Sequence, residues 1–307
     1  MRRYLIFGTA GLSLLMSAID SMAVSVAFPS FTREFQTNVL WSSWTISIFF
    51  IAVTIVVPLA GNLADSFGRK KVFFFSLLLF TGSSLACGLA PRIAVLIAFR
   101  FLQGVGGGCF LPSASGIVSD NFPENRETAI GLFSSIFSVG AVIGPNLGGW
   151  IVSQYSWRYI FYINVPIGML LMASSMLLLE DSKMFTRPRV DLVGVLLMSG
   201  ALLFFMLSLN VIGESVSTPF ILFGALLVVL SFALALCFLR QEKRVPSPIL
   251  DVTLVQSTPF VAANITNLVI GMTMIGVLSF IPLYATSVHG LSTLMIGVIL
   301  SPPDHSQ

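Results

Sequence analysis

The stretch LWSSWTISIFFIAVTIVVPLAGN (residues 40–62), LADSFGRKK (63–71) and VFFFSLLLFTGSSLACGLA (72–90) decides the fold class. It contains two apolar runs, and each is close to the roughly 20 residues that a helix needs to cross a bilayer. The segment between them carries three adjacent cations. This pattern predicts two membrane-spanning helices joined by a charged turn, and it repeats along the chain.

The composition excludes a water-soluble globule. Of the 307 residues, 56% are hydrophobic and 9% are charged, whereas soluble domains carry about 25% charged residues. The mean hydropathy is +0.95. Sixteen basic residues are divided among short loops, so we expect no nucleic-acid partner. The three cysteines lie in apolar stretches and there are two histidines, so we expect neither a disulfide framework nor a metal site.

Nine complete spans are predicted from apolar runs between charge or proline clusters. The first begins like a secretory signal, but eight more spans follow, so we interpret it as a retained helix. After the ninth, residues 291–300 supply about half of the length that a crossing requires. We expect the chain to stop within a tenth helix; a short peripheral C-terminus is the alternative. The spans cover residues 4–29, 40–62, 72–90, 93–119, 128–153, 159–179, 191–212, 219–239 and 259–285.

The distribution of Lys and Arg predicts the orientation. With a cytoplasmic N-terminus, twelve of the sixteen basic residues fall in inner segments and three in outer loops, while Arg100 lies within a span. This bias satisfies the positive-inside rule. Two inner segments, 180–191 and 240–259, carry charge and proline and are interpreted as linkers.

Two ionisable residues lie well inside predicted spans, Asp20 in the first and Arg100 in the fourth. Each costs at least about 2.5–3.5 kcal/mol at the bilayer centre. At 1.5 Å per residue, Asp20 lies about 13 Å and Arg100 about 10 Å below the outer ends of their helices. Because the depths match, we expect a pair. It is either a titratable carboxylate beside a fixed cation in a polar cavity, or a purely structural pair.

Glycines recur at four-residue spacing in two spans, which places a smooth stripe on one helix face. Gly104 and Gly108 form one set, and Gly140, Gly144 and Gly148 form the other. By itself this spacing predicts close helix packing. Pro145 removes a backbone donor and is expected to bend its helix beside the second stripe.

The inner loop at residues 61–71 contains more than orienting charge. Asp65 and the two glycines are not explained by topology. Asp65 could cap a nearby helix N-terminus, and Asp120 could pair with Arg69. Such a cluster could latch two arrangements of helices.

These residues resemble the major facilitator superfamily, specifically its fourteen-helix drug:proton antiporters. The inner loop is similar to motif A, with Ser66 where a basic residue is usual. Residues 140–149 match motif C, which marks exporters in that superfamily. Further similarities are to motif B at residues 96–108, to the first-helix motif at 19–29, with Met22 and Ser25 where Thr and Asn are common, and to a segment typical of the fourteen-helix branch at 157–168.

The resemblance implies an all-α polytopic membrane protein with the major facilitator fold, cut after its ninth helix. Residues 1–180 are then the N-terminal six-helix half, 181–257 hold two linker helices, and 258–307 begin the C-terminal half with one complete helix and a stub. The resemblance also implies roles for individual residues: proton coupling for Asp20 and Arg100; the substrate cavity for Gln103 and Asn146; the antiporter bend for Gly140, Gly144, Pro145, Gly148 and Gly149; and the inner gate for Gly61, Asp65, Gly68, Arg69 and Asp120.

The function implied is proton-coupled export of small amphipathic compounds across the cell membrane by alternating access. The proton gradient is the energy source and no cofactor is expected. Coupling needs both halves, so a transport-inactive membrane fragment or a partner subunit is the alternative, and proton-coupled uptake is a further one. An enzyme is not expected, because no nucleophile, base and orienting group occur together at recognisable spacing.

Overall fold

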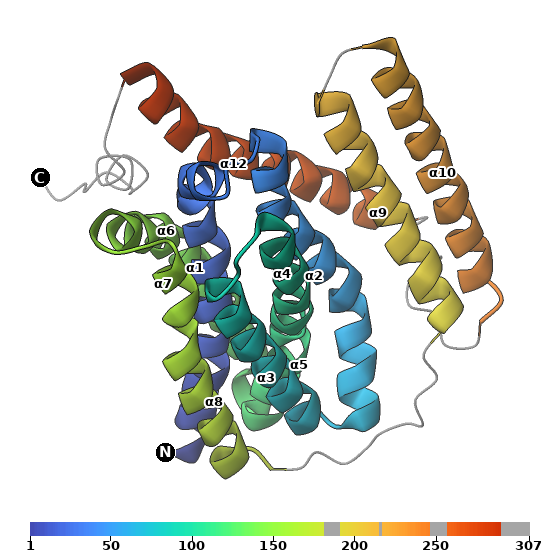
Figure 1. Cartoon of the computed structure of the whole chain (residues 1–307). Helices are drawn as coiled ribbons and strands as arrows, with labels where there is room; N and C mark the ends of the chain where they lie inside the picture. The colour runs from blue at the N-terminus through green and yellow to red at the C-terminus, as the bar shows by residue number, and fades with distance from the viewer. Residues whose placement is uncertain (181–190, 215–216, 246–256, 290–307) are drawn as a thin grey trace, which may run out of the picture.

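A computed structural model describes residues 1–180, 191–214, 217–245 and 257–289 of the chain (Figure 1). The elements in these ranges are helices. Residues 1–180 form α1 (Arg2–Glu34), α2 (Val39–Phe67), α3 (Arg69–Gly88), α4 (Ile93–Gly108), α5 (Phe110–Asn121), a 3₁₀ turn (Pro123–Asn125), α6 (Arg126–Gln154), α7 (Arg158–Tyr162) and α8 (Asn164–Leu178). The remaining helices are α9 (Leu192–Glu214), α10 (Thr218–Glu242) and α12 (Thr258–His289).

Eight helices or helix pairs within the described residues are long and apolar enough to cross a membrane. They correspond to the first eight predicted spans, and α12 covers the ninth as a helix. The predicted all-α polytopic membrane class is therefore confirmed. The stub at 291–300 and most of the two predicted linkers, at 181–190 and 246–256, lie outside the described residues.

Two predicted spans, 93–119 and 159–179, are each divided into two helices, which the prediction of uninterrupted helices missed. The fourth breaks at Cys109 between α4 and α5, and the sixth at Ile163 between α7 and α8. In both cases the first helix ends four residues before a proline, Pro112 or Pro166. Proline has no N–H for the carbonyl four residues earlier, and its ring clashes there, so the regular helix stops at that point.

Glycines set the spacing between helices, as their pattern predicts. A Cβ built on Gly104 of α4 would lie 2.5 Å from the Phe49 carbonyl oxygen on α2. On the opposite side, a Cβ on Gly106 would lie 2.7 Å from the Phe80 nitrogen on α3. Since real Cβ atoms do not approach backbone this closely, α4 fits between α2 and α3 only with glycine at these positions.

The helices of residues 1–180 pack as one bundle, drawn blue to green in Figure 1. Within it, α1 contacts α6, α5 and α8. The hairpin of α9 and α10, drawn yellow and orange, stands to one side, with α9 against α2. The bundle therefore surrounds α1, the helix that carries Asp20.

The core of the bundle consists of two apolar clusters. One includes Ile6, Phe73, Phe110 and Phe133 and the other Phe31, Leu96, Trp157 and Phe161. In each of four segments, the chain passes from one apolar cluster to the other. Buried polar side chains lie at the boundary between the two clusters and form a polar layer. These intervening side chains are Asp20 on α1, Ser84 on α3, Arg100 and Gln103 on α4, and Asn164 on α8.

Candidate functional site

The polar layer is centred on an ion pair between Asp20 and Arg100. Arg100 Nη1 lies 2.6 Å from Asp20 Oδ2, and both side chains are 0% exposed. Arg100 Nε also donates to the Thr45 carbonyl of α2 at 3.0 Å. Removing one partner of such a buried pair typically costs about 3–5 kcal/mol, because the other charge is left uncompensated. The structure thus brings together the two residues whose depths match.

The guanidinium of Arg100 is enclosed rather than exposed to a cavity. Its carbon lies 4.2 Å from the ring centroid of Phe49 and 5.8 Å from that of Phe161, within cation–π range. Its Nη2 is buried and has no hydrogen-bond partner among the described residues. The cation is therefore held by one carboxylate, one carbonyl, one amide and two aromatic faces.

Gln103, for which the resemblance implies a place in the substrate cavity, is buried inside the polar layer. Its Oε1 accepts from Arg100 Nη1 at 2.7 Å, and its Nε2 donates to Asp20 Oδ1 at 3.0 Å and to Ser84 Oγ at 2.6 Å. The geometry makes Gln103 part of the support of the ion pair. This arrangement follows from its position one helical turn after Arg100 on α4, which puts both side chains on the face toward α1.

Asn164 and Ser84 belong to the layer but were not predicted as site residues. Asn164 Nδ2 donates to Asp20 Oδ1 at 2.7 Å and lies 3.4 Å from Ser84 Oγ. Depth along the helices would have identified both, since they lie about 8 and 9 Å from the outer ends of spans 159–179 and 72–90. Neither residue carries a charge, so neither stands out within its apolar span as Asp20 and Arg100 do.

The glycine stripe of α6 packs directly against the part of α1 that carries Asp20. A Cβ built on Gly140 would lie 2.6 Å from Ala18 Cβ, and one on Gly148 would lie 2.8 Å from Ala23 Cα. Gly149 is also buried, and Pro145 lies inside the continuous α6. Asn146, expected in the substrate cavity, donates to the Val142 carbonyl of its own helix at 3.1 Å.

The residues expected at the inner gate converge on Arg69. This side chain contacts Asp65 Oδ1 at 3.2 Å and Asp120 Oδ2 at 2.6 Å, and it donates to the Gly116 carbonyl at 2.9 Å. It thereby joins α2, α3 and α5 within one bundle. Gly68, between α2 and α3, has φ of 97°, which L-residues rarely adopt.

One detail differs from the expectations for this loop. Asp65 does not cap the N-terminus of α3, where no side chain caps the helix. Its carboxylate bonds Arg69 instead, because the two residues are one helical turn apart across the α2–α3 turn. Gly61, also expected at the inner gate, lies in α2, where a Cβ built on it meets nothing within 4 Å.

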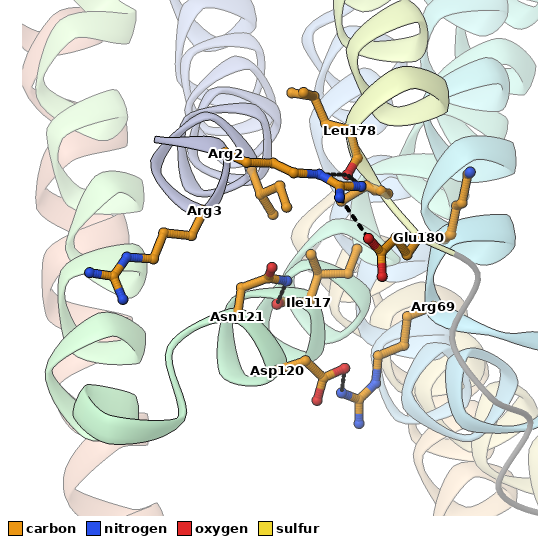
Figure 2. A pocket seen from close by; sticks show the side chains of 11 residues that line it. Arg2, Arg3, Arg69, Ile117, Asp120, Asn121, Leu178 and Glu180 are labelled. Carbon is orange, nitrogen blue, oxygen red and sulfur yellow. Dashed lines mark hydrogen bonds and ion pairs between the residues drawn. The ribbon is translucent and has the colours of Figure 1, made fainter.

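A cavity of about 450 Å³ opens beside this cluster (Figure 2). Arg2, at the start of α1, reaches across it to Glu180, with Nη1 and Oε1 2.6 Å apart, and donates to the Leu178 carbonyl at the end of α8. Arg69 and Asp120 lie on its other side. The start of α1 is thus tied to the end of α8.

At the other end of α1, Glu34 is shared by two side chains beside α7. Trp157 Nε1 donates to Glu34 Oε2 at 2.6 Å, and Arg158 pairs with Glu34 Oε1. Arg158 also stacks on the Trp157 ring, with 4.3 Å between its carbon and the centroid. The chain segment that supplies Asn164 therefore contacts α1 at two levels.

The described residues contain no group of three or more His, Cys, Asp or Glu side chains that could hold a metal ion.

Comparison with known sequences identifies a family and its drug-resistance members. The model of the Major Facilitator Superfamily matches residues 10–211. Multidrug resistance protein 3 of Bacillus subtilis is 32% identical over 293 residues, covering 95% of this chain and 57% of that protein. Multidrug resistance protein Stp of Mycobacterium tuberculosis is 34% identical over 298 residues, covering 95% and 54%. The chain spans about half the length of the curated relatives it matches.

Similar folds occur among solved structures. A bacterial homologue of the human lysosomal transporter Spinster, in an inward-facing conformation, matches with a TM-score of 0.53 and 19% identity, covering 75% of this chain and 60% of that one. The xylose transporter XylE from E. coli matches with a TM-score of 0.50 and 15% identity, covering 77% and 67%. At these identities the likeness concerns the fold alone.

Proposed function

The chain belongs to the Major Facilitator Superfamily, a family of transporters and not of enzymes, and from this premise we propose that it takes part in proton-coupled export of small amphipathic compounds. Its relatives include multidrug resistance proteins and a tetracenomycin C resistance and export protein of Streptomyces glaucescens, and these names support the substrate class and the direction. We assign residues 1–180 to the N-terminal transport half, 181–257 to the linker helices, and 258–307 to the beginning of a second half.

The observation that carries the proposal is the buried ion pair of Asp20 and Arg100. A proton that binds Asp20 neutralises it and leaves Arg100 as a buried cation without its counter-charge. The cost of about 3–5 kcal/mol for breaking such a pair corresponds to a factor on the order of 10²–10⁴ in an equilibrium constant. Moving a two-state equilibrium from 1:99 to 99:1 takes a factor of about 10⁴. In this proposal, protonation of Asp20 biases the equilibrium toward a second arrangement of the helices by up to this order.

The close contact of α1 and α6 supports the same role. Because Gly140, Gly144 and Gly148 bring the α6 backbone against the residues flanking Asp20, a change at Asp20 is transmitted to α6 without an intervening side-chain layer. Pro145 lies in this contact, where the Ala141 carbonyl lacks the N–H that a residue other than proline would supply. In this proposal α6 is the element that bends, and the substrate crosses beside it.

We further propose that the protein lies in the cell membrane with its N-terminus in the cytoplasm, as the bias of Lys and Arg favours. Arg69, Asp65 and Asp120 then lie on the cytoplasmic side and stabilise the inner end of the bundle. The Asp20 layer lies in the outer half of the membrane, closer to the side from which protons enter.

Reconstitution tests the export proposal. The purified 307-residue chain is placed in proteoliposomes loaded with ethidium, a lipophilic cation, and a pH gradient is imposed. We expect gradient-dependent movement of the dye, which is lost in Asp20→Asn. Movement of the dye in the same direction as the protons would show proton-coupled uptake instead of export. The same dye movement in Asp20→Asn and in protein-free vesicles would contradict coupled transport by this chain.

A second candidate is a subunit that transports only with a complementary chain. Co-expression with a second-half polypeptide of a relative tests this candidate. Transport by the pair, with none by either chain alone, would support the subunit interpretation.

A further inference from the structure

We propose that Asn164 is a positioning residue for Asp20. Its side-chain amide stays hydrogen-bonded to the same carboxyl oxygen of Asp20 before and after that oxygen takes up a proton. The proposal rests on the proposed function, because it assumes that Asp20 exchanges a proton. It assigns to α8 a part in coupling that neither the charge pattern nor the glycine pattern indicates.

The two oxygens of Asp20 have different partners. Oδ2 accepts from Arg100 Nη1 at 2.6 Å. Oδ1 accepts from Gln103 Nε2 at 3.0 Å and from Asn164 Nδ2 at 2.7 Å. Oδ2 keeps its bond to the cationic guanidinium, whereas both donors at Oδ1 are neutral amides, a group that can also accept a hydrogen bond. We therefore assign the proton to Oδ1. The neighbours of Oδ1 therefore decide how easily the proton binds.

The two amides at Oδ1 differ in freedom to turn. The Gln103 amide is fixed, because its oxygen accepts from Arg100 while its nitrogen donates to Asp20 and Ser84. The Asn164 amide donates to Asp20 and Ser84 through its nitrogen, and its oxygen accepts no hydrogen bond from a described residue. An amide carries both a donor and an acceptor. Asn164 can therefore turn and accept the new O–H of a protonated Asp20, whereas Gln103 would have to leave Arg100.

The place of Asn164 in the fold suits this role. It is the first residue of α8, immediately after the break at Ile163 that Pro166 imposes. Arg100 and Gln103 both come from α4 and move together. Asn164 comes from a separate helix whose far end is tied to the start of α1 through Arg2 and Glu180. A change in the bond between Asn164 and Asp20 therefore alters the contact between α8 and α1.

The charged surroundings of Asp20 are simple, so a change at Asn164 can be interpreted. Arg100 of α4 is its ionic partner. From α3, Cys87 lies 3.9 Å from Gln103 Oε1. From α6, Gly140 and Gly144 approach with backbone alone, and α2 contributes the Thr45 carbonyl bound to Arg100. A neutral substitution at Asn164 changes none of these groups.

The test is an infrared difference titration of the purified 307-residue chain in lipid nanodiscs, where Asp20→Asn identifies the carboxyl band of Asp20. In Asn164→Leu the carboxylate loses a donor, so we expect Asp20 to take up its proton at about tenfold lower proton concentration than in the parent. Asn164→Gln, which restores an amide, should return most of the shift. Asn164→Ser keeps the position polar but is too short to bond Asp20, and should behave like Asn164→Leu if the leucine variant does not fold.

Asn210→Leu provides the matched control. Asn210 lies in α9, away from the polar layer, and donates to the Met206 carbonyl at 2.9 Å. In this variant the titration of Asp20 should not change. An unchanged titration in both Asn164→Leu and Asn164→Ser would overturn the positioning role. Dye transport that keeps the parent's pH dependence in these variants would also overturn it while leaving the export proposal standing. A shifted titration without dye transport would support the positioning role and contradict export.

Discussion

Gly144 of α6 lies directly against the turn of α1 that carries Asp20: a Cβ at this position would stand 3.0 Å from the Ile19 carbonyl oxygen and 2.7 Å from Met22 Cβ. The glycine stripe of α6 and the buried acid of α1 are therefore parts of one helix contact. The sequence shows the glycine spacing and the acid as separate features. In the structure they meet, because the backbones of α6 and α1 approach closely beside the buried charge of Asp20.

This contact predicts a steric penalty. Gly144→Ala should force α6 away from α1 and lower the stability by about 1–3 kcal/mol, the usual range for overpacking. Thermal unfolding in detergent would show a lower midpoint. Gly131→Ala on the same helix is the control, because a Cβ there meets nothing within 4 Å. Equal midpoints for the two variants would contradict the close packing.

The ion pair of Asp20 and Arg100 predicts strong coupling between the two positions. Asp20→Leu and Arg100→Leu should each destabilise the chain by about 3–5 kcal/mol, because each leaves a buried charge uncompensated. The double variant should lose much less than the sum of the two. A double-mutant cycle of denaturant unfolding measures this difference. Additive losses would mean that the two charges do not stabilise one another.

The Arg69 cluster predicts a smaller, local effect at the inner end. Arg69→Ala removes the bonds to Asp65, Asp120 and the Gly116 carbonyl, but both carboxylates are half exposed, so the loss should be about 0–1 kcal/mol. Hydrogen exchange at the end of α5 should accelerate by up to about fivefold. Lys70→Ala, next along α3, should leave that exchange unchanged. The same acceleration in both variants would argue against a specific cluster.

The outer contact of Glu34 predicts a specific role for Trp157. This side chain is 2% exposed and donates to Glu34, so Trp157→Phe should lower the thermal midpoint through the loss of a charge-assisted hydrogen bond, worth about 1.5–3 kcal/mol. Trp150→Phe is the matched control, because Trp150 is 46% exposed. Glu34→Gln keeps an acceptor for Trp157 Nε1, whereas Glu34→Ala removes it. Equal thermal midpoints for these two variants would show that the hydrogen bond from Trp157 does not stabilise the fold.

The proposed orientation predicts opposite labelling of two exposed loop positions. In a chain whose three cysteines are replaced by serine, Arg92→Cys should react with a membrane-impermeant thiol reagent added to intact cells. Glu124→Cys should react only after the membrane is opened. Both positions are exposed in the structure. The reverse labelling would place the N-terminus outside.

Much of the architecture could be predicted from the sequence because a membrane helix is defined by length and apolarity along the chain. Helices cover all nine predicted spans, two of which are divided, and the one-turn spacing of glycines indicated tight packing. The breaks at Cys109 and Ile163 were missed although Pro112 and Pro166 signal them. A proline can be accommodated in a continuous helix, as Pro145 is in α6, so its presence alone does not predict an interruption.

The sequence by itself determined depth: at a fixed rise per residue, the level of Asp20 and Arg100 in the membrane follows from counting. Only the tertiary structure decided direction, that is, which face of each helix turns inward and which helix stands next to it. It placed Gln103 in the support of the ion pair, joined Asn164 to Asp20, and brought Trp157 to Glu34. Depth is a property of one helix, whereas rotation and neighbourhood arise from the packing of all of them together.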